Sequence, residues 1–239
     1  MAARDATGER DDLLVCELGL VSYTEAFELQ SRLASRRREE ELPDTLLLLE
    51  HPPTYTRGRR SLPDELPHDE GFYRARGIEV HDTDRGGRIT YHGPGQLVGY
   101  PIMRTADVGA YLRAMEAAIV AALAQEGVRA RSRCAEGPDY TGVWVGDRKI
   151  ASIGVHISRG VTTHGFAVNV DNNLEPFSAV VACGLPGVAM TSLERELPSG
   201  AELDPTRFRV GMAREFAVGH GRKPRFVPAA ELEASAVPA

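Results

Sequence analysis

The spacing of apolar residues in the first fifty positions alternates between the periods of a strand and of a helix. Leu13 to Leu20 is an apolar run of strand length, and Thr45 to Leu49 is too short for a buried helix and precedes two prolines. Between them, Ser22 and Glu25 form a capping box ahead of apolar residues that recur on one helical face. The pattern therefore predicts strand, helix and buried strand in that order.

The middle of the chain favours short strands joined by hairpins. Strands are predicted over Ile78 to His81, Arg88 to His92, Gln96 to Met103, Tyr140 to Val145, Lys149 to Ser158 and Val161 to Val170. Glycine-containing turns separate the last three runs, which indicates an antiparallel meander. Residues 55–71 show no regular period and are expected to be irregular.

Two further helices are predicted from their caps, and together with the strands they define the fold class. Asp107 precedes an Ala-rich helix to about Glu126, and Asp204-Pro205 precedes a last helix to about Val218. Because most strands are joined by hairpins, the pattern indicates an α+β fold: a single domain with a mixed, largely antiparallel sheet flanked by helices. We expect a disordered leader at 1–12, the domain at 13–220 and a C-terminal tail at 221–239.

Composition and charge narrow the partners. A chain of 239 residues with 42% hydrophobic and 26% charged residues suits one domain. The 28 Lys and Arg against 34 Asp and Glu give a net charge of −6, which would repel a phosphate backbone, so nucleic acid is not an expected partner. The three cysteines match no zinc pattern and include no CxxC, so neither a metal site nor a disulfide framework is expected.

The sequence also suggests a cellular location. Its N-terminal residues contain no apolar signal region, and no stretch approaches the roughly 18 apolar residues of a membrane span. We therefore expect a cytoplasmic protein without a membrane partner, in a compartment where thiols stay reduced and available for chemistry.

Residues 85–96 contain four glycines between two predicted strands. Such a segment is either an ordinary hairpin turn or a place where the backbone approaches a ligand. An RNA-binding reading is weaker, because the RGG motif occurs once in an acidic chain. Tyr91 and His92 could equally be packed residues or catalytic ones.

Lys149 and Cys183 are ambiguous when each is taken alone. A lysine at the start of a strand commonly extends along the surface to water. A cysteine after an apolar run such as residues 179–182 is commonly a small buried hydrophobe. A function for either residue needs further context.

That context is a resemblance to a known family. The runs RGGRITYHGPGQLVGYP and KIASIGVHISRGVTTHGFAVNV, then a Cys-Gly pair followed by Thr-Ser-Leu, resemble the signature segments of the LipB family of octanoyltransferases, in the same order. With the run EHPPTYT at residues 50–56, the resemblance covers about residues 13–220. Each motif is weak alone, but their combination and order are specific.

The resemblance implies a fold, a reaction and partners. It implies the biotin/lipoate protein-ligase fold and transfer of an octanoyl group from octanoyl-acyl carrier protein, without ATP or another cofactor. The acceptors would be lipoyl domains of 2-oxoacid dehydrogenases and the glycine cleavage H protein. Cys183 matches the nucleophile that carries the acyl group as a thioester, and Lys149 matches the residue that lowers the thiol pKa.

The resemblance also implies an acyl pocket. The residues that match it are Arg85, Gly86, Gly87, Arg88, Ile89, Thr90, Tyr91, His92, Ser152, Ile153, Gly154, Gly165, Phe166 and Ala167.

Two alternative functions and one basic surface are also suggested by the sequence. Arg57-Gly58-Arg59-Arg60 is faintly similar to a loop of ATP-dependent biotin ligases, and a non-catalytic acyl-binding or lipoyl-domain-binding module would also fit the fold. Because acceptor lipoyl domains tend to be acidic, a local basic patch of Arg57, Arg59, Arg60 and Arg88 is expected.

Overall fold

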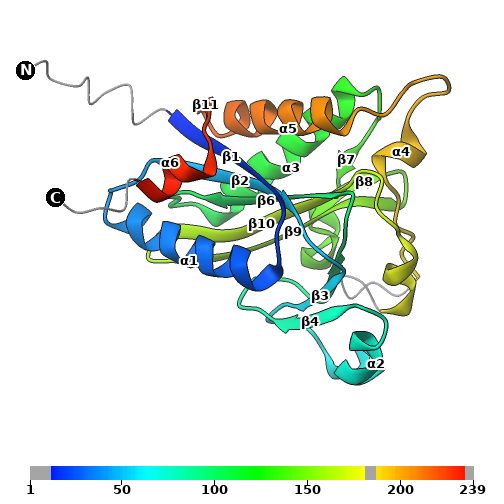
Figure 1. Cartoon of the computed structure of the whole chain (residues 1–239). Coiled ribbons are helices and arrows are strands. Elements are labelled where there is room, and N and C mark those ends of the chain that lie inside the picture. The colour runs from blue at the N-terminus through cyan, green and yellow to red at the C-terminus, as the bar shows by residue number, and fades with distance from the viewer. Residues whose placement is uncertain (1–11, 181–186, 235–239) are drawn as a thin grey trace, which may run out of the picture.

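The computed structural model of the chain describes residues 12–180 and 187–234, which form a large and a small sheet with helices (Figure 1). The strands are β1 (Asp12–Leu20), β2 (Asp44–Glu50), β3 (Thr54–Arg57), β4 (Glu79–Asp82), β5 (Thr90–His92), β6 (Gln96–Ile102), β7 (Arg131–Ser132), β8 (Gly142–Val145), β9 (Arg148–Ser158), β10 (Val161–Asn169) and β11 (Lys223–Phe226). The helices are α1 (Tyr23–Arg38), α2 (Glu70–Arg74), α3 (Val108–Gln125), α4 (Leu193–Glu196), α5 (Pro205–Gly219) and α6 (Ala229–Ala234). Short 3-10 turns cover Pro63–Glu65, Cys134–Glu136, Pro138–Tyr140 and Glu175–Ala179.

The large sheet has the order β11-β1-β2-β6-β10-β9-β8-β7. β1 runs parallel to both of its neighbours, and the other neighbouring pairs are antiparallel. The small sheet has the order β4-β3-β5, with one parallel and one antiparallel pair. The predicted α+β fold with a mixed, largely antiparallel sheet is confirmed.

Helices cover both faces of the large sheet, which is why its central strands are apolar throughout (Figure 1). In β2, Leu46 and Leu48 join the core under α3 and α5, whereas Leu47 and Leu49 join the core under α1 and α6. Side chains alternate between the two faces of a strand, so a strand covered on both sides needs an unbroken apolar run. The run of four leucines meets that need.

The three long helices begin where their caps predict. The Ser22 side chain accepts from the backbone N–H of Glu25, and the Glu25 side chain returns to the Ser22 backbone, which completes the capping box of α1. The Asp107 and Asp204 side chains accept from backbone N–H groups in the first turns of α3 and α5. These caps satisfy donors that an α-helix leaves unpaired at its start.

The structure differs from the sequence predictions in two regions. Residues 55–71 are not wholly irregular, because they contain most of β3, a 3-10 turn and the start of α2. The expected tail from residue 221 is wrong up to residue 234: β11 pairs with β1, the Val227 N–H donates to the Val15 carbonyl (2.9 Å), and Leu232 is buried. The leader predicted at 1–12 lies outside the described residues except for Asp12, which begins β1.

One helix is apolar enough to cross a membrane by length and composition alone. Within residues 12–180 and 187–234 this helix is α3, 18 residues long, although no stretch of the sequence was expected to approach a membrane span. Its residues Tyr111, Met115, Ile119 and Leu123 pack into the core shared with α5 and the sheet. The hydropathy of α3 is therefore accounted for by packing within the domain.

Candidate active site

A cavity of about 340 Å³ lies between the two sheets. We call it the inter-sheet cavity. Its lining residues are Tyr23, Arg60, Arg85, Gly86, Gly87, Arg88, Ile89, Thr90, His92, Tyr100, Val108, Leu112, Pro138, Asp139, Thr141, Lys149, Ser152, Ile153, Gly154, Val155, His164, Gly165, Phe166 and Ala167.

The cavity exists because β8 stops short along β9. The pairing of the two strands ends where Gly142 faces Ser152, so the later part of β9 has no β8 partner. The glycine-rich segment 85–87 approaches instead, and the Gly86 N–H donates to the Val155 carbonyl (2.9 Å). A Cβ at Gly154 would lie 2.7 Å from the Gly86 carbonyl oxygen, so only glycine permits this approach.

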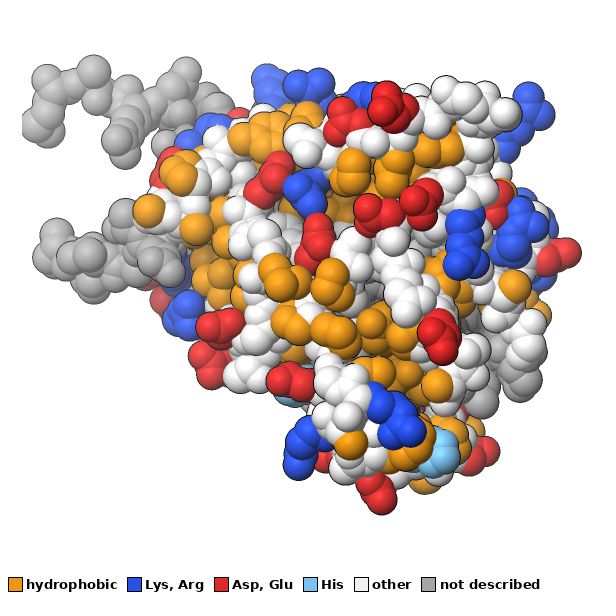
Figure 2. Space-filling model, turned by 45° about the vertical axis from the view of Figure 1, so that its right-hand side comes forward, with side chains coloured by type: hydrophobic (Ala, Val, Ile, Leu, Met, Phe, Trp, Pro, Cys, Tyr) orange, Lys and Arg blue, Asp and Glu red, His pale blue; other side chains and the backbone are white. Residues whose placement is uncertain are grey.

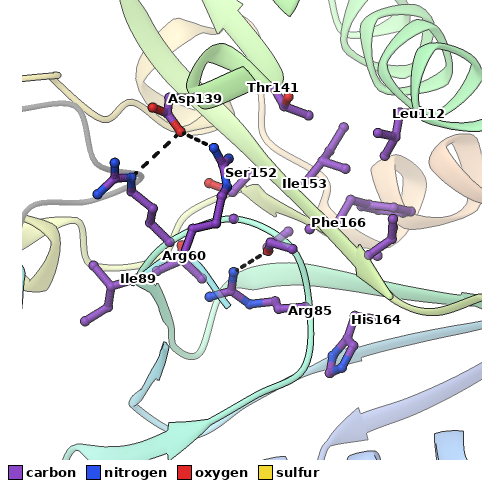
Figure 3. Close-up of a pocket in the computed structure, with 18 of the residues that line it drawn as sticks. Arg60, Arg85, Ile89, Leu112, Asp139, Thr141, Ser152, Ile153, His164 and Phe166 are labelled. Atoms are coloured by element: carbon purple, nitrogen blue, oxygen red, sulfur yellow. Dashed lines mark hydrogen bonds and ion pairs between the residues drawn. The ribbon is translucent and has the colours of Figure 1, made fainter. Parts of the chain in front are cut away.

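The structure brings the predicted pocket residues together around this cavity, with one exception (Figure 3). Tyr91 does not line the cavity, and its ring packs against Tyr55 and Phe177 in the core of the small sheet. The reason is strand alternation: Thr90 and His92 of β5 face the cavity, so Tyr91 between them faces the opposite way. Tyr91, unlike the other residues expected at the acyl pocket, therefore does not line this cavity.

Lys149 lies in β9 and is buried, with 2% of its surface exposed. Its Nζ donates to the Thr141 carbonyl (3.0 Å) and lies 5.3 Å from the centre of the Trp144 ring. Burial of an ammonium costs free energy, and the hydrogen bond and the aromatic ring offset that cost. The side chain therefore does not extend to water, and its charge is held at the cavity wall.

Cys183 lies outside the described residues, but the chain on both sides of it is placed. Before it, Val180 packs against the small-sheet core that includes Ile89, a cavity residue. After it, the Lys149 N–H donates to the Ala189 carbonyl (2.9 Å), and the Thr191 N–H donates to the Lys149 carbonyl (2.9 Å). Val180 therefore lies against the small-sheet core, and the chain from Ala189 to Thr191 runs beside the backbone of Lys149.

Comparison with known proteins identifies the family. The family model described as the lipoyl protein ligase A/B catalytic domain matches residues 22–217. The chain belongs to that family. An octanoyltransferase of Rubrobacter xylanophilus is 47% identical over 84% of this chain and 88% of its own length. Another, from Caldicellulosiruptor saccharolyticus, is 41% identical over 92% of this chain and 94% of its own.

A solved structure shows the same fold. The crystal structure of a lipoate-protein ligase A bound with ATP superposes with a TM-score of 0.73 over 95% of this chain and 92% of that chain, at 20% identity. The expectation of a lipoate-ligase-like fold is confirmed, and at this identity the likeness concerns the fold alone.

One end of the cavity in this ligase-family domain is polar and closely packed. The buried His51 ring donates from Nδ1 to the Val21 carbonyl (2.7 Å), so its Nε2 accepts from the Tyr100 hydroxyl (2.8 Å). Burial lowers the pKa of His51 to about 4, and it raises the pKa of Tyr23 to about 12. Both groups are therefore neutral at physiological pH.

His92 continues this neutral cluster. Its Nδ1 donates to the Gln96 side-chain oxygen (2.7 Å), and its ring centre lies 5.5 Å from that of His51. Burial, followed by the proximity of His51, lowers the pKa of His92 well below its usual value. His92 therefore presents a neutral imidazole to the cavity.

His164 enters the cavity through an unusual backbone conformation. It has a φ of 57°, rare for a residue other than glycine, and its paired residue Val155 packs toward α3 and α5. Its ring instead lies against Phe27 of α1 and near Tyr100, and its Nε2 donates to Asp84 (2.7 Å). The positive φ thus turns the imidazole to the α1 face of the sheet. The hydrogen bond from His164 keeps the pKa of the Asp84 carboxyl below its ordinary value.

The predicted basic patch is largely neutralised. Arg57 forms ion pairs with Asp82 and Glu70 (2.7 Å each), and Arg88 and Arg60 pair with acidic side chains at the cavity. Figure 2 shows one face of the molecule, on which acidic and basic side chains are interspersed. The arginines therefore present little net positive charge, because carboxylates lie within contact distance of three of the four.

Sequence reasoning missed several cavity residues. Tyr23, Leu112 and His164 line the cavity from α1, α3 and β10, and Asp139 and Thr141 line it from the 3-10 turn before β8 and the residue that follows it. His164 stood inside a motif already singled out, whereas the others carried no local signal. They reach the cavity through tertiary packing of segments far apart in the sequence.

Proposed function

We propose that this chain transfers an octanoyl group to a lysine of a lipoyl domain through a thioester on Cys183, with Lys149 beside the sulfur. The chain is an octanoyltransferase, as are the relatives that align over most of both sequences. Membership of the lipoyl protein ligase A/B family supports a lipoyl domain as the acceptor. The observation that carries the mechanism is a buried lysine at the cavity, whose backbone is hydrogen-bonded to Ala189 and Thr191, six and eight residues after the cysteine.

The chain lengths support contact between the two groups. Cys183 is three residues from Val180 and four from Gly187, so its Cα lies within about 11 Å and about 14 Å of theirs, because an extended chain spans at most about 3.6 Å per residue. Val180 packs against the small-sheet core that includes Ile89, and the Ala189 carbonyl accepts from the Lys149 backbone N–H. These short spans support the proposed contact between Cys183 and Lys149.

The chemistry needs both residues. A free thiol with a pKa near 8.5 is only a few per cent thiolate at neutral pH. An ammonium about 4 Å away favours the thiolate by on the order of 4 kcal/mol at an effective dielectric constant near 20, less the cost of desolvation. Lys149 is a buried cation on the cavity wall and can therefore activate the sulfur.

The reaction has two acyl transfers. The Cys183 thiolate attacks the carbonyl carbon of the donor thioester, a new C–S bond forms, and the donor thiolate leaves. The acceptor lysine amine then attacks the Cys183 thioester, an amide forms, and the cysteine sulfur leaves. In the first transfer the leaving donor thiolate takes a proton from the Lys149 ammonium, and in the second the neutral Lys149 amine accepts the proton that the acceptor amine loses. Neither step consumes ATP, because the donor is already activated.

The inter-sheet cavity suits an acyl chain. Ile89, Ile153, Phe166 and Ala167 give it apolar walls, and Lys149 lines the same cavity. Each methylene buried there contributes about 0.8 kcal/mol, which supplies affinity for a medium-length chain. We assign the predicted pocket residues other than Tyr91 to this role.

The donor and acceptors follow from the same assignment. We propose octanoyl-acyl carrier protein as donor, and lipoyl domains of 2-oxoacid dehydrogenases and the glycine cleavage H protein as acceptors, in the cytoplasm. The ATP-dependent ligase is the alternative reaction on this fold. Transfer from an acyl thioester after complete removal of nucleotide separates the two, since a ligase would be inactive.

The test of the nucleophile is intact-protein mass spectrometry after exposure to octanoyl-acyl carrier protein alone. We expect one octanoyl adduct on a peptide containing Cys183, and none in Cys183→Ser. Cys134→Ser is the matched control because Cys134 is exposed, and Cys16 is a poor competitor because burial raises its pKa to about 11. An adduct on Cys16 or Cys134 in the wild-type protein would refute the assignment.

The test of Lys149 separates the two steps. Lys149→Arg keeps a cation and should retain acylation by the donor, but it should lose transfer to the acceptor, because arginine is too weak an acid to relay protons. Single-turnover assays of each step measure this division. Equal loss of both steps would contradict the proton-relay role.

A further inference from the structure

A series of ion pairs lies at the inter-sheet cavity, where Figure 3 shows two interactions of Asp139. Arg60 Nη1 lies 3.0 Å from Asp139 Oδ1, and Arg88 Nε lies 3.8 Å from the same oxygen. Arg88 Nη1 in turn contacts Glu65 Oε1 at 2.7 Å, and the Glu65 carboxylate is buried. Charges therefore alternate along this series from Glu65 to Asp139.

The two arginines of these ion pairs are attached to the glycine-rich segment 85–87. The Arg60 N–H donates to the Gly87 carbonyl (3.0 Å), and Arg88 directly follows Gly87. Glu65 is held in turn, because its Oε2 accepts from the Leu62 N–H (3.0 Å). Asp139 thus faces two arginines whose backbones adjoin or are hydrogen-bonded to the glycine-rich segment, although the Arg60 side chain itself is 45% exposed.

Asp139 is connected to Lys149 through a single short turn. It is the middle residue of the 3-10 turn Pro138–Tyr140, which leads into Thr141. The Thr141 hydroxyl donates to the Pro138 carbonyl (2.9 Å), so the turn and Thr141 move together. The Thr141 carbonyl is the oxygen that accepts from Lys149 Nζ.

The Lys149 side chain has little freedom to find another acceptor. Gly142 has a φ of 132°, and a Cβ there would lie 2.8 Å from Lys149 Cε and 2.4 Å from the Ala151 carbonyl oxygen. The buried Glu116 carboxylate, beyond Gly142, accepts from the Gly142 N–H (2.9 Å) and the Ser132 hydroxyl (2.6 Å). Glu116 thus holds Gly142 in place, and the carbonyl of the preceding residue, Thr141, directs the ammonium through its own hydrogen bond.

We propose that Asp139 is a positioning residue for the transfer reaction: its ion pair with Arg60 holds Thr141 against Lys149 and so fixes the ammonium relative to the cavity. This inference rests on the proposed role of Lys149. In this proposal the arginines at the cavity align residues within the site. The sequence had instead predicted that they form a basic surface for an acidic lipoyl domain. Small displacements of an aligned group can cost large factors in rate, on the order of a hundredfold for 1 Å.

The test is a double-mutant cycle between Asp139 and Lys149. Asp139→Asn keeps the shape of the side chain and removes its charge. We expect kcat for octanoyl transfer to fall about tenfold or more, KM for the donor to change less than about twofold, and the midpoint pH of Cys183 alkylation by iodoacetamide to rise. In a Lys149→Ala background, Asp139→Asn should produce no further change in either quantity.

Two controls separate positioning from general damage. Glu136→Gln removes an exposed carboxylate from the neighbouring 3-10 turn, where it pairs with Arg133, and should leave kcat and the alkylation profile unchanged. Arg60→Lys, which keeps a cation opposite Asp139, should retain more activity than Arg60→Gln, which removes it, because the proposed role depends on the ion pair.

The outcomes are distinguishable. Additive effects of Asp139→Asn and Lys149→Ala, or a fall in kcat with an unchanged alkylation profile, would overturn the positioning role alone. An alkylation profile that Lys149→Ala leaves unmoved would overturn the proposed dyad and this inference with it. Asp139→Asn could instead lose activity because less of the protein is folded. A lowered Tm together with a wild-type kcat per folded molecule would also overturn the positioning role.

Discussion

Lowering the pH from 7 toward 4 should destabilise the fold through His51. The ring is fully buried, its Nδ1–H donates to the Val21 carbonyl, and its Nε2 accepts from the Tyr100 hydroxyl. A second proton would have to be placed on Nε2, where it would face the hydroxyl hydrogen. Protonation therefore breaks this hydrogen bond and introduces a buried charge.

The magnitude follows from the pKa of His51, which burial lowers from 6.5 to about 4 in the folded state. Because each pKa unit corresponds to about 1.4 kcal/mol, the neutral ring contributes about 3 kcal/mol of stability. The folded-state pKa is depressed, so the unfolded chain binds more protons between pH 6.5 and 4. The contribution is fully present above pH 6.5 and is lost as the pH falls to about 4.

The assay is urea denaturation at a series of pH values from 8 to 4, on the wild type and on His51→Gln. Glutamine can keep a donor and an acceptor but does not titrate, and the comparison at pH 8 gives the cost of the substitution itself. The difference in unfolding free energy between the two proteins should shrink by about 3 kcal/mol between pH 6.5 and 4, at no more than about 1.4 kcal/mol per pH unit. A difference that is constant with pH would refute the reasoning.

Three other predictions follow from the fold and the cavity. Ser22→Ala should lower the unfolding free energy, measured by chemical denaturation, by about 1 kcal/mol through loss of the α1 cap. Ser31→Ala in the helix interior should lower it less. Truncation after Gly221 should cost at least about 2 kcal/mol in the same assay, because it removes β11 and the buried Leu232, and a truncated chain of wild-type stability would contradict this. Ala167→Leu should lower kcat/KM for octanoyl donors by about fourfold for each methylene it excludes and spare acetyl donors, and equal effects on both would place the acyl chain elsewhere.

Local sequence features determined the elements. The capping residues Ser22, Asp107 and Asp204 and the apolar run of β2 placed three helices and a central strand, because caps and periodicity act within a few residues. The terminal strand β11 was missed, since its short sequence KPRF has no apolar alternation. It is a strand because β1 offers an unpaired edge.

Only part of the candidate site could be predicted from the sequence. Resemblance selected Lys149 and the glycine-rich and β9–β10 segments, and the structure gathers them around one cavity. It assigned Tyr91 to that cavity, although the alternation of β5 turns the ring away. Motif matching identifies segments, whereas strand alternation determines which side chains of a segment face the ligand.

The sequence by itself determined the fold class, the main helices and strands, and the chemical types available for catalysis, because these depend on neighbours along the chain. Only the tertiary structure decided that Lys149 is buried, that the predicted basic patch is paired with acids, and that Asp139 meets Arg60 across the cavity. These outcomes depend on contacts between residues as much as 79 positions apart, as for that ion pair. No local pattern encodes such contacts, because they arise only when the two sheets close on each other.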